Sequence, residues 1–188
     1  MQGRIETVLN EKDVNIIKDH EKKQLEHYKK ENDIEDMTAK EQVDLMERLL
    51  IQRSIAIHKL IDECVDVWYT DTKETPDRLK ILFNGVQALR VSFSRLALND
   101  IIEPLGLGRY LLDSDMLPEK KQIFDVIKQL SFNAYNEPKI IRQILQILDY
   151  YEFNRQDIMT EYIDQIKFEK WCNDWVRSRR STSSNGKT

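Results

Sequence analysis

The segment TPDRLKILFNGVQALRVSFSRLALNDII, residues 75–102, carries the pattern that decides the fold. Apolar residues recur in it every three or four positions, the spacing of one face of an α-helix; they are Leu79, Leu82, Phe83, Val86, Leu89, Phe93, Leu96 and Ile101. The opening Thr-Pro-Asp supplies a capping hydroxyl, a proline at the first helical position and an acid that the helix dipole favours. The segment therefore predicts an amphipathic helix over about 76–102.

The stretch before this segment has the same apolar spacing and predicts a helix over about 39–69. Thr38 and Glu41 open it as a capping box, because each side chain can accept a hydrogen bond from the other residue's backbone N–H. Cys64 falls on the apolar stripe of this helix, so we expect it to be a small core residue.

Three further helices are predicted after residue 102, over about 118–131, 138–152 and 155–178. Asn154 and Asp157 form a looser capping pair ahead of the last one. No stretch alternates between apolar and polar residues for long enough to compete as a strand. We therefore expect an all-α fold, a bundle of about five helices that forms one domain over residues 38–178.

The first 37 residues differ from this bundle. Between Lys18 and Asp33 there are five lysines and five acids, and the only sizeable apolar side chains are Leu25 and Tyr28. An isolated helix of that composition is marginal, so we expect residues 1–37 to be an exposed, charged helical arm. A thin coiled coil in a homodimer, with Leu25 and Tyr28 at its seam, remains as the alternative.

Charge is uneven along the chain. The net charge is −4, and Arg177, Arg179, Arg180 and Lys187 contribute +4 with no acid after Asp174, so residues 1–176 carry −8. A body of that sign repels a phosphate backbone, which disfavours nucleic acid as a partner. Residues 179–188 are Ser-rich and basic, and we expect them to form a disordered tail.

Composition narrows the class of protein. Of the 188 residues, 40% are apolar and 33% are charged, which excludes wholesale disorder, and two cysteines cannot make a disulfide framework. No apolar run approaches the roughly 20 residues that span a bilayer, and no charged-then-apolar leader opens the chain. We expect a cytoplasmic protein in a reducing environment, without a membrane partner.

The residues that usually carry catalysis or bind metals do not form a recognisable pattern. His20 and His27 are seven residues apart, whereas helical metal ligands are typically four apart. His58 and Cys64 lie too far apart along one helix to act as a nucleophile pair. The glycines at 106 and 108 lack the preceding strand and the further residues of a phosphate-binding loop. We expect no catalytic residue, no metal and no cofactor.

Aromatic residues gather in the last third of the chain, and five of them are candidate partner-binding residues: Tyr151, Phe153, Phe168, Trp171 and Trp175. Trp171 and Trp175 are one helical turn apart and would form a single ridge. Protein interfaces are enriched in such side chains, but helical cores contain them too. Both interpretations remain open from the sequence alone.

Residues 38–106 contain three short stretches that we compare as one set: Leu60-Ile61-Asp62, Asn84-Gly85-Val86-Gln87-Ala88-Leu89 and Ile101-Ile102-Glu103-Pro104-Leu105-Gly106. With them the segment resembles the GrpE-type nucleotide exchange factors of Hsp70 chaperones. The resemblance implies a helical hairpin that dimerises, a stalk formed by the charged arm, and co-chaperone activity on an Hsp70. The chain departs from the family after Gly106, where the motif of the C-terminal β-domain is absent.

These observations favour a non-enzymatic helical module for protein–protein interaction, an adaptor or scaffold subunit whose partner is another protein. The alternative is a GrpE-like exchange factor that acts on an Hsp70. A third hypothesis, a metal-dependent helical enzyme, would have to use scattered carboxylates and His58.

Overall fold

The computed structural model describes residues 9–31, 38–64, 75–102, 120–132 and 136–184. This part of the chain is helical and contains no strand, which confirms the all-α fold class. Its six helices are α1 (Glu11–Glu31), α2 (Ala39–Glu63), α4 (Arg78–Ile102), α5 (Lys120–Phe132), α6 (Glu137–Tyr150) and α7 (Arg155–Ser184).

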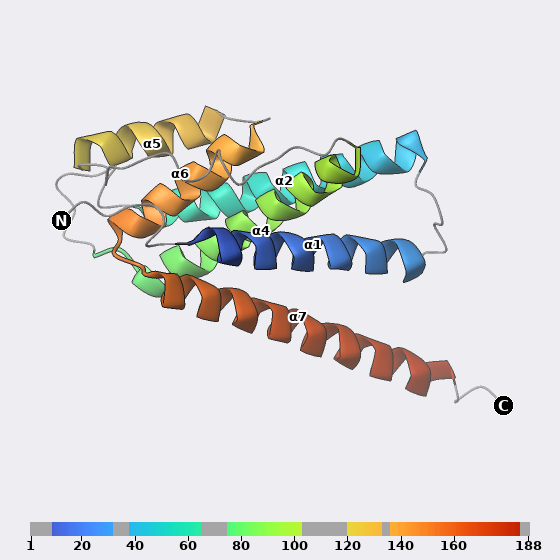
Figure 1. Ribbon diagram of the computed structural model, residues 1–188. Helices are drawn as coiled ribbons and strands as arrows, with labels where there is room; N and C mark the ends of the chain where they lie inside the picture. The colour runs from blue at the N-terminus through green and yellow to red at the C-terminus, as the bar shows by residue number, and fades with distance from the viewer. Residues whose placement is uncertain (1–8, 32–37, 65–74, 103–119, 133–135, 185–188) are drawn as a thin grey trace.

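The segment that decides the fold forms α4, which is the central helix. It packs against α1, α2, α6 and α7, while α5 packs on α6 and touches α2 (Figure 1). Ile81, Leu89 and Phe93 of α4 are almost completely buried in the core. At Gly85 a Cβ atom would lie 2.7 Å from Leu148 Cδ2, so α6 packs directly on the α4 backbone.

Local capping sets where the helices begin. Thr38 and Glu41 form the predicted capping box of α2. The Asn154 side chain accepts hydrogen bonds from the backbone N–H groups of Gln156 and Asp157, as the looser cap of α7 predicts. At α4 the cap differs from the prediction, because Asp77, rather than the threonine before the proline, accepts from the backbone N–H groups of the first turn.

The expectation of an exposed arm is wrong for α1. Val14, Ile17 and Leu25 of this helix are buried against the rest of the protein. Leu25 packs in a cluster with residues of α2 and α4, so it is not available for the seam of a dimeric coiled coil. Residues 1–8 and 32–37 and the side chain of Tyr28 lie outside the described part.

The other boundaries shift by a few residues. α2 ends at Glu63, with Cys64 buried as its C-cap; the end predicted near residue 69 falls outside the described part. α7 continues to Ser184, so six residues of the segment expected to be a disordered tail are helical. The described part leaves out residues 65–74, 103–119 and 185–188, and with them the glycines at 106 and 108. Among the described helices, none has the length and apolar character needed to cross a membrane.

Candidate interaction surface

The first half of α7 is fixed to the body by polar contacts. At its start, Arg155 Nε lies 2.5 Å from Asp13 Oδ2, and a second guanidinium nitrogen lies 2.7 Å from Oδ1. Nearly three turns further along α7, the Gln165 side-chain amide donates to the Phe83 carbonyl oxygen at 3.0 Å. These contacts tie α7 to α1 and α4 and fix which face of α7 is turned away from the body.

The middle of α7 is fixed by a charged network around Glu21 of α1. Arg90 of α4 forms two hydrogen bonds to Glu169, at 2.7 and 2.9 Å, and lies 3.5 Å from Glu21. The hydroxyl groups of Ser94 and Tyr162 lie 2.7 and 3.3 Å from the Glu21 carboxylate oxygens. Three helices therefore meet at one buried carboxylate, which is 4% exposed.

The network keeps Glu21 ionised although it is buried. Burial works to raise the pKa of Glu21, but the hydrogen bond to His20, the charge of Arg90 and the Ser94 hydroxyl outweigh it and lower the pKa. For Tyr162, burial and the charge of Glu21 raise the pKa, so the hydroxyl stays protonated and keeps donating. His20 Nδ1 lies 2.9 Å from the Tyr162 hydroxyl oxygen, so this histidine joins the network at its edge.

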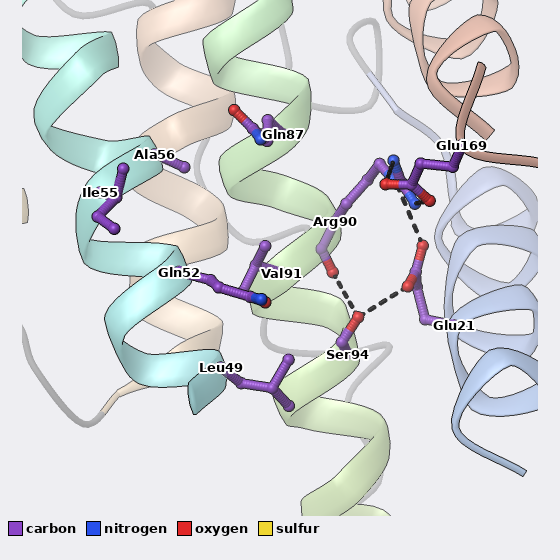
Figure 2. Close-up of a pocket in the computed structure, with 10 residues that line it drawn as sticks. All are labelled: Glu21, Leu49, Gln52, Ile55, Ala56, Gln87, Arg90, Val91, Ser94 and Glu169. Carbon is purple, nitrogen blue, oxygen red and sulfur yellow. Dashed lines mark hydrogen bonds and ion pairs between the residues drawn. The ribbon is translucent and has the colours of Figure 1, made fainter. Parts of the chain in front are cut away.

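A groove of about 350 Å³ runs over α4 beside this network (Figure 2). One wall is the apolar side of α2, with Leu49, Ile55 and Ala56. The opposite wall is charged and belongs to α1 and α7, with Glu21 and Glu169. The charged wall already pairs with Arg90, so these carboxylates are used to hold helices together.

The outer face of α7 carries the most exposed aromatic side chains of the described part. Phe168 is 64% exposed and Trp171 is 62% exposed, and their rings stack with centroids 6.0 Å apart. Their neighbour Glu169 is held toward α4, which turns Phe168 and Trp171 away from the body. In Figure 1 this half of α7 diverges from α1, and a cavity of about 350 Å³ separates the two helices there.

The five candidate partner-binding residues do not share one environment. Tyr151 and Phe153 are 5% and 7% exposed and belong to the core, so their assignment to a partner surface is wrong. Phe168 and Trp171 are exposed on α7. Trp175 lies one turn further along the same helix, and its side chain is outside the described part.

Sequence reasoning missed a buried cluster of charges. Arg53 of α2 and Arg95 of α4 both donate to Oε1 of Glu137, at the start of α6, and Arg95 also donates to the Met46 carbonyl oxygen at 3.2 Å. All three charged residues are at most 4% exposed. The sequence does contain a sign that Arg53 is buried, because it lies four residues after Leu49 and four before Ile57, on the apolar stripe of α2.

The histidine and cysteine candidates occupy separate places. His58 is exposed on α2, where its Nδ1 lies 2.6 Å from the Ser54 carbonyl oxygen. Cys64 is buried and its thiol donates to the Leu60 carbonyl oxygen. Within the ranges that the structure describes, no group of three or more His, Cys, Asp or Glu side chains is placed to hold a metal ion.

Comparison with known proteins adds no relative. No protein-family model, no curated protein and no solved structure matches this chain. The resemblance of residues 38–106 to GrpE-type exchange factors therefore stays a prediction from the sequence.

Proposed function

We propose that this chain is a non-enzymatic protein–protein interaction module, an adaptor or scaffold subunit that binds its partner with the outer face of α7. The observation that carries the proposal is the stacked pair of Phe168 and Trp171, each more than 60% exposed on a helix that is otherwise well anchored. Aromatic residues are enriched at protein interfaces, and tryptophan is among the residue types that most often dominate binding energy.

The anchoring of α7 supports this function. Glu169 lies between Phe168 and Trp171 in the sequence, and its carboxylate pairs with Arg90 of α4. Because this pair holds α7 in place, the two rings are exposed without further ordering of the backbone. A preformed surface loses less conformational entropy on binding than a flexible one. Neither Cys64 nor Cys172 is in a disulfide bond, which fits the proposed cytoplasmic location.

Site-directed photo-crosslinking tests the proposal. A photoreactive phenylalanine analogue at position 171 of the full chain, expressed in the native cell, should give a discrete adduct. The matched control carries the same analogue at Phe124, an exposed aromatic residue on α5. Identical adducts from both positions, or none from position 171, would remove the proposal.

A nucleotide-release assay separates this function from the exchange-factor alternative. The interaction module should leave nucleotide release from an Hsp70 unchanged at stoichiometric amounts. Acceleration that survives the Trp171→Ala substitution would favour the GrpE-like alternative and a different binding surface.

A further inference from the structure

The groove over α4 combines an apolar side with an acidic side (Figure 2). Ile55 and Ala56 of α2 and Val91 of α4 form the apolar side, and Glu21 and Glu169 form the acidic side. Its volume of about 350 Å³ is in the range of sites for small ligands, which are mostly apolar with a few polar groups. The groove therefore has the size and the lining of a ligand site.

The acidic side carries more negative than positive charge. Glu21 and Glu169 share one guanidinium group, that of Arg90, so two carboxylates and one cation leave a net charge of −1. Among the described residues that line the groove, no other side chain is charged. The net charge of −8 over residues 1–176 adds a field of the same sign. The groove therefore attracts a cation.

Glu169 is the carboxylate that a ligand can reach. Its side chain is 60% exposed, whereas Glu21 is buried. Each Glu169 oxygen accepts one hydrogen bond from Arg90, and a carboxylate oxygen has lone pairs for two. Glu169 therefore keeps the capacity to accept from a second donor while it holds α7 on α4.

Gln87 of α4 supplies an unused acceptor in the same groove. Its side chain lines the groove, and its buried Oε1 has no hydrogen-bond partner among the described residues. A buried acceptor without a partner is unusual and costs free energy. Because Oε1 makes no hydrogen bond, the amide can turn toward a ligand without breaking one. A donor on the ligand would satisfy it.

We infer that this groove binds a small organic cation, an ammonium group on an apolar body. An ammonium group has three donors and no acceptor, so it matches the acceptors of Glu169 and Gln87 and brings the positive charge that the acidic side lacks. The apolar body packs against Ile55 and Val91. The inference goes beyond the proposed function, because it uses a surface other than the exposed Phe168 and Trp171.

Titration of the isotope-labelled full chain with phenethylammonium, followed by NMR, tests the site. At up to about 20 mM, a range suited to a ligand of roughly ten non-hydrogen atoms, backbone amide signals of the groove should shift. Phenethyl alcohol, which has a hydroxyl in place of the ammonium group, should bind at least about tenfold more weakly. Equal affinity for the alcohol, or shifts only outside the groove, would overturn the inference.

A lysine placed in the groove tests its location. Ile55 is 51% exposed, so Ile55→Lys should leave the fold intact and put a competing ammonium group beside Glu169. It should weaken phenethylammonium binding at least about tenfold. The matched control is Val43→Lys, because Val43 is 55% exposed on the same helix and lies outside the groove, about 18 Å away along the axis. Equal weakening by both lysines would show only a general effect of charge and would contradict the site.

Gln87→Leu tests the unused acceptor. The change should keep the free energy of unfolding or raise it, because it removes a buried oxygen that has no partner. It should also weaken phenethylammonium binding about threefold or more, the effect of one hydrogen bond. Unchanged affinity would remove Gln87 from the site.

A free amine and a lysine side chain of another protein share this chemistry. Titration with Nα-acetyl-lysine amide, whose side-chain ammonium group is free, separates the two sources. Tighter binding than that of phenethylammonium would assign the groove to a partner's lysine, and weaker binding would assign it to a small amine. If neither cation binds, the inference is wrong, and the proposed interaction through Phe168 and Trp171 is unaffected.

Discussion

Asp13 and Arg155 join the first helix of the bundle to the last, across 142 residues of sequence. Two hydrogen bonds, 2.5 and 2.7 Å long, connect the carboxylate to the guanidinium. Asp13 is completely buried, whereas the Arg155 side chain is about half exposed. The arginine therefore brings a positive charge from the surface to a carboxylate that has no contact with water.

Arg155→Ala should destabilise the protein more than the removal of an exposed ion pair does, because it leaves the buried Asp13 carboxylate without its charged partner. The hydrogen bond from Arg155 lowers the pKa of Asp13, so the stability that the pair contributes is present at neutral pH and is lost as pH falls through that lowered pKa. Urea unfolding at pH 7 and in acid measures both effects. Lys167→Ala, which removes an exposed ion pair with Asp164, should cost less than about 1 kcal/mol.

Asp149→Asn should stabilise the protein at neutral pH. Burial raises the pKa of Asp149 to about 6. Stability from its protonated form is therefore present below the unfolded pKa, near 4, and is lost as pH rises through about 6. Allowing for partial exposure, the gain at pH 7.5 should be about 1–2 kcal/mol and should vanish near pH 4. Chemical denaturation across this pH range measures the difference in stability, with Asp62→Asn as the exposed control.

The charged cluster of Arg53, Arg95 and Glu137 should respond in opposite ways to partial and complete removal. Glu137→Ala leaves two buried guanidinium groups without their carboxylate, which should cost about 3–5 kcal/mol. Replacing all three residues by methionine or leucine should recover most of that loss, because no buried charge remains. A triple variant less stable than Glu137→Ala would contradict this account. Chemical denaturation of the two variants measures the difference.

Gly85 and Leu148 should be coupled in stability. Gly85→Ala places a methyl group against Leu148 Cδ2 and should cost about 1–3 kcal/mol through overpacking. Leu148→Ala should cost about 2–5 kcal/mol, because this side chain is completely buried. The double variant should cost less than both single changes added, since the new methyl enters the vacated space. Strict additivity in a double-mutant cycle would show that the two residues do not press on each other.

What the sequence could predict is the local part of the fold. The capping box of Thr38 and Glu41 and the cap at Asn154 involve residues within one helical turn, so spacing alone identifies them. The helix over 76–102 is predicted for the same reason. The packing of α1 was not predictable this way, because partners of its charged residues, such as Arg90 and Arg155, lie far away in sequence.

The candidate surface was only half predictable. Tyr151 and Phe153 belong to the same aromatic-rich region as Phe168 and Trp171, so composition cannot tell core from surface there. What separates them is a turn after α6, in which Glu152 adopts a positive φ of 62° and the Phe153 N–H donates to the Leu148 carbonyl oxygen. This turn folds Phe153 back onto the body, whereas Trp171 lies on a helix that continues outward.

The buried carboxylates of α1 depend on residues that are synthesised after it. The ribosome releases α1 first, yet the side chains that satisfy Asp13 and Glu21 arrive with Arg90, Tyr162 and Arg155. Until these residues emerge, hydration is the better environment for both carboxylates. Helix α1 can pack on α4 before α7 is made, but Asp13 receives its guanidinium partner only when α7 has left the exit tunnel, so a chain terminated before Arg155 keeps this carboxylate without it.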